Sequence, residues 1–232
     1  MRPTCSSSWR SATKSHGSHF QIVRGAWSRA LLCATLVCLV SAARAQLDPT
    51  QPISQYVHQT WQDDQGLPQN DVLAITSTRD GYLWLGTEEG LVRFGGIHFV
   101  VFDSRSTPGL KNNTITALFE DRDKNLWIGT LGGLFRMTRG VISACPVPEK
   151  LSGRCVTAFH QDREGGLWVA TDGGGVGRLL SRQFTVYTTR NGLARDAVFS
   201  ISGGRDGSVW PGSHGGLNQW KNGEFTGRTE YQ

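Results

Sequence analysis

The chain has 232 residues, with 24 basic and 19 acidic side chains and a formal net charge of +5. A basic protein of this size can bind nucleic acid, but here the positive charge is unevenly distributed. Residues 1–45 contain six basic residues and no acidic one, which leaves 18 basic against 19 acidic residues in 46–232. The nearly neutral remainder argues against a nucleic-acid partner.

The basic N-terminal segment has the three regions of a secretory signal peptide. Arg24 and Arg29 precede an apolar run over residues 30–40, and the small-residue site Ala43-Arg44-Ala45 follows. The apolar run, about 11 residues long, is shorter than a bilayer-spanning helix needs. We therefore expect residues 1–45 to be removed, the mature chain to begin at Gln46, and the product to be exported to the periplasm. An uncleaved membrane anchor is the alternative.

The rest of the chain is a repeat. Trp84, Trp127, Trp168 and Trp210 follow one another at intervals of 43, 41 and 42 residues. Each has an acidic residue four positions before it, apolar residues nine and twelve positions before it, and a Gly-apolar step after it. A repeat of about 42 residues holds four short strands with their turns, which is the size of a β-propeller blade.

The residue types favour strands over helical repeats of similar length. β-Branched and aromatic residues stand in short runs broken by Gly, Asp and Asn, a pattern that would interrupt helices. In the first unit we expect strands at about 71–77, 82–87, 90–94 and 98–103. The Trp should fill the space between neighbouring blades, and the Gly after it should let backbones approach closely. Residues 46–232 are thus predicted to be an all-β, partial propeller.

Counting strands predicts that this propeller is open. Residues 55–61 align with the outer strands at 98–103 and 184–189, so the fold should begin with an orphan fourth strand. The last unit has a fourth strand of its own at 225–228. Four full blades and one unmatched strand would leave two apolar end faces. We expect residues 46–232 alone to be unstable, aggregated or self-associated, and the working protein to be longer.

Two cysteines remain after residue 45, Cys145 and Cys155. An even number of cysteines in an oxidising compartment predicts a disulfide. It would close the stretch that replaces the fourth strand and the loop between the second and third units. Two free thiols are the alternative, because sequence alone does not fix the geometry.

The sequence predicts no catalytic, cofactor-binding or metal-binding residues, and it leaves the ligand-binding residues unassigned. Residues 121–125 (DRDKN) begin like a calcium loop, but they lack its sixth-place Gly and distal Glu, so a turn explains them. His160 comes closest to a phospho-accepting histidine. It stands at the end of a strand that recurs at the same place in each repeat, so we interpret it as a structural residue. Sequence cannot place the carboxylates of Glu88, Glu89 or Asp172 in one cleft, as a glycosidase would need.

The first unit resembles the two-component regulator propeller repeat. The residues that carry the resemblance are Asn70-Asp71-Val72, Asp80-Gly81, Leu83-Trp84-Leu85-Gly86-Thr87 and Gly90-Leu91-Val92-Arg93-Phe94. The linkers at 66–70 and 187–193 are similar to that family's joint between blades, and the resemblance covers about residues 55–232. Departures are Pro211 in place of an aliphatic residue, Ala170 in place of Gly, and an extra residue in the glycine run 173–175.

The resemblance implies a sensory role without catalysis. Members of this family form the periplasmic ligand-sensing part of sensor histidine kinases, with recognition in the loops at one mouth of the channel. It implies no cofactor, an unknown small ligand such as an oligosaccharide, and contact with the membrane only through parts downstream of this chain. No kinase domain is expected within these residues. A secreted propeller enzyme, such as a polysaccharide or lactone lyase, is the alternative.

Overall fold

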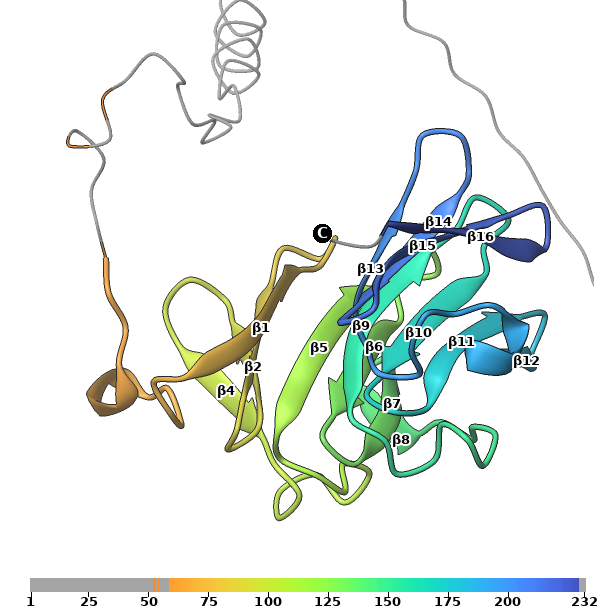
Figure 1. Cartoon of the computed structure of the whole chain (residues 1–232). Coiled ribbons are helices and arrows are strands. Elements are labelled where there is room, and N and C mark those ends of the chain that lie inside the picture. Colours follow the sequence, from red (N-terminus) through yellow and green to blue (C-terminus); the bar gives the residue numbers. More distant parts are fainter. Residues whose placement is uncertain (1–51, 53, 55–58, 230–232) are drawn as a thin grey trace, which may run out of the picture. The chain divides into compact units, whose positions relative to one another are not determined.

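The computed structural model describes residues 52, 54 and 59–229. The predicted signal peptide at residues 1–45 lies outside this part of the chain, so cleavage after Ala45 stays a prediction. Residues from Gln59 onward form one compact unit, shown as the coloured ribbon in Figure 1. No helix in the described residues is long and apolar enough to cross a membrane.

In the described residues, sixteen strands form four antiparallel sheets, and each sheet is one sequence repeat. Two short 3-10 helices, η2 (Asp63–Gln65) and η3 (Thr189–Asn191), lie in the linkers before β1 and β13. The strands are, in chain order, β1 (Val72–Ser77), β2 (Leu83–Thr87), β3 (Leu91–Phe94), β4 (Phe99–Phe102), β5 (Ile115–Glu120), β6 (Leu126–Thr130), β7 (Gly133–Thr138), β8 (Val141–Ala144), β9 (Val156–Gln161), β10 (Leu167–Thr171), β11 (Gly175–Leu180), β12 (Gln183–Tyr187), β13 (Val198–Gly203), β14 (Val209–Ser213), β15 (Gly216–Lys221) and β16 (Glu224–Thr229).

The four blades stand side by side in an open arc. Strands β1, β5, β9 and β13 form the inner edges and pack against one another in that order (Figure 1). Strands β4, β8, β12 and β16 form the outer edges. The chain is therefore an all-β, open β-propeller, as the repeat predicted, and the strands expected in the first unit are each correct to within one residue at either end.

The blades are held together by apolar clusters that lie between neighbouring sheets. Trp84 of the first blade packs with Ile115 and Ile128 of the second, and Trp168 of the third blade packs with Val198 and Val209 of the fourth. The predicted role of the tryptophans is confirmed by these contacts. Burying an aromatic side chain of this size against a neighbouring sheet is a large part of what stabilises each pair of blades.

A bulge recurs at the start of the inner strand in every blade. The pairing register shifts after the first residue of the strand, so the second residue leaves the ladder. Such bulges re-aim a side chain. In the second and third blades that residue is Thr116 or Thr157, and its hydroxyl donates to the carbonyl of Val156 or Val198 in the next blade, at 2.6 Å in both cases.

The second blade corrects two predictions. Its fourth strand is present as β8, so residues 145–155 form only the linker. The expected disulfide is not formed, since Cys145 and Cys155 are both free. Cys145 extends the outer strand β8, whereas Cys155 reaches Thr116 on the inner strand β5. Three strand spacings of about 4.8 Å lie between β8 and β5, and a disulfide requires Cα atoms within about 7 Å.

The departures in the later repeats have local effects. Pro211 lies within β14 and pairs with Ile201, but neither Pro211 nor Trp210 pairs with β15. This gap is expected at a residue that lacks a backbone donor. Ala170 still packs in one cluster with Val198, so the blade joint tolerates a methyl group there.

The predicted orphan strand lies mostly outside the described residues, which begin again at Gln59. Residues 59–61 are not assigned as a strand, but Trp61 packs edge-on against Phe94 and Phe99, at centroid distances of 5.0 and 6.5 Å. Tyr187 stands at the equivalent repeat position and packs edge-on against Phe225 at 5.4 Å. Trp61 therefore occupies the place of an outer-strand residue from a preceding blade.

Candidate ligand-binding face

One face of the arc carries the turns that join the first and second strands of each blade, and we call it the turn face. Each of these turns places an arginine five positions before the repeated Trp. The four arginines are Arg79, Arg122, Arg163 and Arg205. Because the repeat is regular, they form a row along the turn face with one member in each blade.

The first three arginines in the row each bond to the next blade. Nη1 of Arg79 donates to the carbonyl of Arg122 at 2.9 Å, and Nη1 of Arg122 donates to the carbonyl of Arg163 at 3.2 Å. Nη2 of Arg163 donates in the same way to the carbonyl of Arg205. These three bonds therefore connect each blade to the next, and in each of them the acceptor is a backbone carbonyl.

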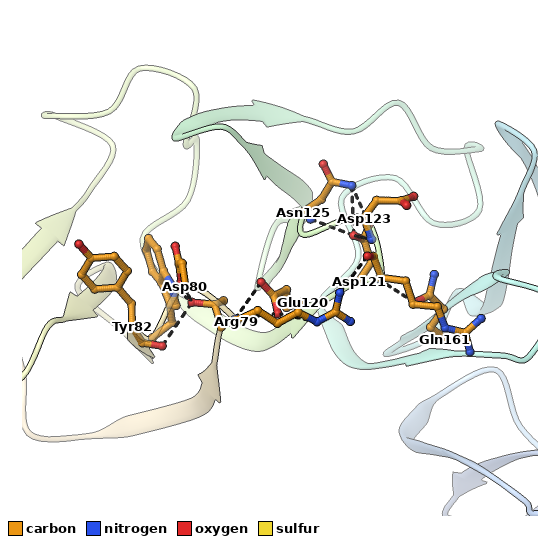
Figure 2. A network of polar contacts seen from close by, with 11 residues as sticks. Arg79, Asp80, Tyr82, Glu120, Asp121, Asp123, Asn125 and Gln161 are labelled. Carbon is orange, nitrogen blue, oxygen red and sulfur yellow. Dashed lines mark hydrogen bonds and ion pairs between the residues drawn. The ribbon is translucent and has the colours of Figure 1, made fainter. Parts of the chain in front are cut away.

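The backbone of the same arginines adds bonds across the first two joints. The N–H of Arg79 donates to both carboxylate oxygens of Glu120 at 3.1 and 3.2 Å, and the N–H of Arg122 donates to Oε1 of Gln161 at 3.0 Å (Figure 2). Glu120 and Gln161 occupy the same position in their repeats. Hydrogen bonds of this kind fix one blade's turn relative to the next.

Buried carboxylates anchor the tryptophans beneath the turn face. Oδ2 of Asp121 accepts the indole N–H of Trp127 at 2.8 Å, and Oδ2 of Asp162 accepts that of Trp168 at 2.7 Å. Both aspartates are 5% exposed. In the first blade the hydroxyl of Thr78 takes this place, at 3.1 Å from the Trp84 indole nitrogen.

A cavity of about 440 Å³ opens on the turn face between the third and fourth blades. Its charged lining consists of three acidic and three basic residues: Asp162, Glu164, Asp206, Arg163, Arg178 and Lys221. Trp220 lies beside Arg178, whose guanidinium stacks over the Trp220 ring at 5.1 Å and over the Trp168 ring at 5.5 Å. The cavity thus combines balanced charge with an aromatic wall.

The charged groups of this cavity are paired. Nη2 of Arg178 lies 2.7 Å from Oδ2 of Asp162 and 2.6 Å from Oε2 of Glu164, and Nζ of Lys221 lies 2.7 Å from Oδ2 of Asp206. Burial acts to raise the pKa of Asp162, but bonds from Trp168, Arg178 and Gly166 outweigh it and lower that pKa. The hydrogen bond from Lys221 is the largest cause that lowers the pKa of Asp206. Both carboxylates are therefore held ionised.

A second, smaller hollow lies at the free end of the fourth blade. It has a volume of about 230 Å³ and is lined by Phe199, Gly212, His214 and Leu217 among others. The rings of Phe199 and His214 are 4.6 Å apart. This hollow faces the place of the next blade, not a loop of the turn face.

The residues weighed from the sequence do not come together as a site. The Asp121 carboxylate accepts the backbone N–H groups of Asp123 and Asn125 at 2.9 and 2.8 Å, in addition to the Trp127 indole, so its turn explains residues 121–125. Glu88 and Asp172 follow β2 and β10, with the whole second blade between them. Among the described residues, no group of three His, Cys, Asp or Glu side chains could hold a metal ion.

His160 is a packing residue of the joint between the third and fourth blades. A Cβ added to Gly203 would meet its imidazole ring, so the absence of a side chain at Gly203 makes room for it. Burial lowers the pKa of His160, in spite of the opposing charge of Asp162. A neutral imidazole that is enclosed in this way fits the role of a packing residue in a strand that recurs in every blade.

Sequence reasoning missed the arginine row and the cavity beside it. A signal for the row was present, since an arginine directly precedes the aligned acidic residue in every repeat. The cavity had no such signal, because Arg178 comes from the third strand of one blade while Trp220 and Lys221 come from the third strand of the next.

The fold is that of an open β-propeller built from four repeated blades. Residues 66–89, 109–132 and 150–173 match the sequence model of the two component regulator propeller. Three segments of this chain are therefore similar to the repeat of that family. The fourth unit, which contains Pro211, is outside the matched segments.

Solved structures of bacterial extracellular domains share this fold. The extracellular domain of a B. thetaiotaomicron protein assigned as a hybrid two-component system has a TM-score of 0.64 at 26% identity, over 72% of this chain and 26% of that chain. The extracellular domain of a B. thetaiotaomicron protein assigned as a one-component system has a TM-score of 0.61 at 22% identity, over 69% and 25%. This chain thus spans about a quarter of the length of either domain.

An enzyme shares the fold as well. A virginiamycin B lyase from Staphylococcus aureus has a TM-score of 0.56 at 17% identity, over 69% of this chain and 56% of that chain. At this identity the likeness concerns the fold alone. Among curated proteins, none matches this chain.

Proposed function

We propose that this chain is the ligand-sensing propeller of a two-component sensor, exported to the periplasm and not catalytic in itself. The observation that carries the proposal is the set of three in-phase repeats of the regulator propeller family, together with the likeness to an extracellular domain at 26% identity. The signal-peptide pattern of residues 24–45 supports export. A kinase output and contact with the membrane would come from parts beyond these residues.

The proposed ligand site is the cavity between the third and fourth blades. Its volume of about 440 Å³ falls within the range of ligand pockets, about 300 to 1,000 Å³. Three acidic and three basic side chains give it no net charge, and they offer donors and acceptors on facing walls. A neutral ligand rich in hydroxyl groups, such as an oligosaccharide, suits this lining better than an anion or a cation does.

A propeller lyase is the second candidate, and the same side chains argue against it at this site. General acid or base catalysis needs a group that exchanges a proton near the working pH. Asp162 and Asp206 are paired with Arg178 and Lys221, and their pKa values are lowered. Carboxylates held in this state bind and orient a ligand, but they do not donate protons near neutral pH.

Binding and turnover experiments together test the proposal. The purified exported chain would be titrated with neutral cello-, xylo- and malto-oligosaccharides, and with a charged oligogalacturonate, by calorimetry. We expect saturable binding of a neutral sugar that weakens at least tenfold in Asp206→Asn and Lys221→Gln, because these exposed rim residues line the cavity. Lys111→Gln, in the linker between the first two blades, is the matched control.

Two results would contradict the proposal. Binding of none of the neutral sugars would reject the ligand class. Turnover of quinupristin, a ligand bound in a crystal structure of the S. aureus lyase, or of a polysaccharide would show an enzyme in place of a sensor.

A further inference from the structure

A cavity of about 220 Å³ lies between the outer parts of the second and third blades. One wall is a cross-strand row of the second blade, because Trp127 pairs with Arg136 and Arg136 pairs with Ser143. The other wall contains Leu179 and Phe184, which pair with each other in the third blade. Paired residues on neighbouring strands point to the same face of a sheet. The cavity is separate from the one between the third and fourth blades, and its chemistry does not depend on the proposed function.

The walls of this cavity are mainly apolar. Trp127, Leu179 and Phe184 pack in one hydrophobic cluster, and Cys145 joins that cluster at the end of β8. The Arg136 guanidinium lies over the Trp127 ring, at 5.5 Å from its centroid. An engineered apolar cavity of about 150 Å³ binds benzene. The cavity between the second and third blades is therefore large enough for a six-membered ring with a small substituent.

The charge in this cavity is positive. Among the described residues that line it, the charged ones are Arg136 and Arg182, and no carboxylate is present. Arg182 lies in the two-residue turn between β11 and β12, where Ser181 and Arg182 both have a positive φ, 49° and 68°. Both arginines are exposed, and within residues 59–229 neither guanidinium makes a hydrogen bond or an ion pair. Two cations thus share one apolar cavity without an anion.

The corresponding arginine of the third blade is neutralised by its own blade. Nη2 of Arg178 lies 2.7 Å from Oδ2 of Asp162 and 2.6 Å from Oε2 of Glu164. A glycine makes this pairing possible, because a Cβ on Gly166 would lie 2.7 Å from Oδ2 of Asp162 and 2.8 Å from Nε of Arg178.

The second blade has Asn125 at the position of this glycine. The Asn125 side-chain amide donates to Oδ2 of Asp121 at 2.9 Å, and the same oxygen accepts the Trp127 indole N–H at 2.8 Å. Asn125 therefore occupies the place that Arg178 has in the third blade. Arg136 is left with the Trp127 ring and the open cavity.

We propose that the cavity between the second and third blades binds a small aromatic carboxylate. The aromatic ring contacts Trp127, Leu179 and Phe184, and the carboxylate accepts hydrogen bonds from Arg136 and Arg182. Guanidinium groups bind carboxylates through strong, often bidentate hydrogen bonds. The ligand is an anion because both charged groups of the lining are cations, and it is aromatic because two aromatic rings stand in the apolar walls.

Benzoate and its neutral isostere benzamide are the probes for this site. Each is titrated into the purified exported chain, and ligand-observed NMR measures binding. We expect saturable binding of benzoate, and about tenfold weaker binding in Arg136→Gln and in Arg182→Gln, because each variant loses a hydrogen bond to a charged group. Arg190→Gln, in η3 and outside the cavity, is the matched control and should bind benzoate like the wild type. Circular dichroism checks that each variant is folded.

The two thiols give a second readout. Cys145 lines the cavity and Cys155 does not, and burial raises the pKa of both thiols. Iodoacetamide is uncharged, and peptide mass spectrometry gives its rate of reaction with each thiol. Benzoate at about ten times its dissociation constant leaves about one site in eleven free, so it should slow the alkylation of Cys145 about tenfold and leave that of Cys155 unchanged.

Several outcomes would overturn the proposal. They are the absence of saturable benzoate binding, equal binding of benzamide, and unchanged benzoate binding in either folded arginine variant. Protection of neither thiol, or of both to the same extent, would show that benzoate does not occupy this cavity. If one arginine variant does not fold, the other variant and the alkylation rates decide.

Discussion

Val156 occupies the space above Gly129 in the neighbouring blade, so these two residues determine how closely the second and third blades approach. A Cβ on Gly129 would lie 2.7 Å from Cγ1 of Val156 and 3.1 Å from the Cβ of Ala117. Neither contact can be relieved by a flexible side chain, because both partners are short and buried. Gly129 is therefore required by packing between the second and third blades.

Gly129→Ala should destabilise the protein through overpacking of this joint. We expect a loss of about 1 to 3 kcal/mol in the free energy of unfolding. Val156→Ala alone should also destabilise, by leaving a cavity. The double variant Gly129→Ala/Val156→Ala should lose at least about 1 kcal/mol less than the sum of the two single losses. The smaller side chain at position 156 makes room for the methyl group added at position 129, and that methyl group fills the cavity. Urea denaturation measures all three, and strictly additive effects would contradict the close contact between Gly129 and Val156.

Removing an arginine from the middle of the row should weaken the joint without changing the fold. Arg122→Ala loses the bond to the Arg163 carbonyl, and we expect a loss of about 1 kcal/mol. Arg190→Ala, an exposed arginine of η3, is the matched control and should change stability by less than about 0.5 kcal/mol. Equal effects of the two substitutions in urea denaturation would show that the row does not hold the blades together.

The sequence predicted the blades because their determinants are local and periodic. Trp84, Trp127 and Trp168 are all buried between sheets, and each is followed two positions later by a small residue, so one periodic pattern encodes the blades. Trp210, in the last blade of the described residues, is only half-buried. The arginine row could not be read in the same way. An arginine beside an acid in a turn is typical of a solvated surface, and its acceptor lies 41 to 43 residues away in the next blade.

The cysteine pairing and the cavity both depend on distances that sequence does not contain. Cys145 and Cys155 are ten positions apart, but one extends an outer strand and the other precedes an inner strand, so the width of a blade separates them. The cavity between the third and fourth blades arises from side chains of separate repeats. Arg178 and Lys221 have no common motif, and only the packing of one blade on the next brings them together.

The N-terminus of the exported protein should be Gln46. The apolar run at residues 30–40 is too short to remain as a stable anchor, and a small-residue site follows it. Mass spectrometry of the protein recovered from a periplasmic extract checks the prediction. A product that still contains residues 30–45 would indicate an uncleaved anchor.

Acid should weaken the joint between the third and fourth blades through His160. Burial lowers the pKa of His160 in the folded protein, so the unfolded chain takes up a proton at a higher pH than the folded one. This contribution to stability is complete above the ordinary pKa of 6.5 and is lost as the pH falls below it. Through this one group, the free energy of unfolding can change by at most about 1.4 kcal/mol per pH unit.

Urea denaturation between pH 7.5 and 5.5 tests this dependence. The wild type should lose stability over this range, whereas His160→Gln should lose less because it has no imidazole to protonate. His98→Gln, at an exposed position before β4, should behave like the wild type. Parallel curves for the wild type and His160→Gln would mean that the imidazole does not contribute.

Asp162 and Asp121 make the same bond to their tryptophans, but only Asp162 is also paired with an arginine. Its Oδ2 accepts from Nε of Arg178 at 2.8 Å, in addition to the Trp168 indole. Asp162→Asn removes the charge and leaves the half-buried Arg178 guanidinium with one carboxylate partner in place of two, at a cost of about 2 kcal/mol. Asp121→Asn loses no ion pair and should cost about 1 kcal/mol.

The pH dependence of the stability loss in Asp162→Asn distinguishes the contribution of the ion pair from that of packing. The lowered pKa of Asp162 means that its contribution is present above the unfolded-state pKa, about 3.9, and is lost as the pH falls through the folded-state pKa. The difference between the wild type and Asp162→Asn, measured by urea denaturation at pH 7, should therefore shrink under acid conditions. A constant difference at all pH values, or an equal cost for Asp121→Asn at pH 7, would show that the Arg178 pair does not stabilise the third blade.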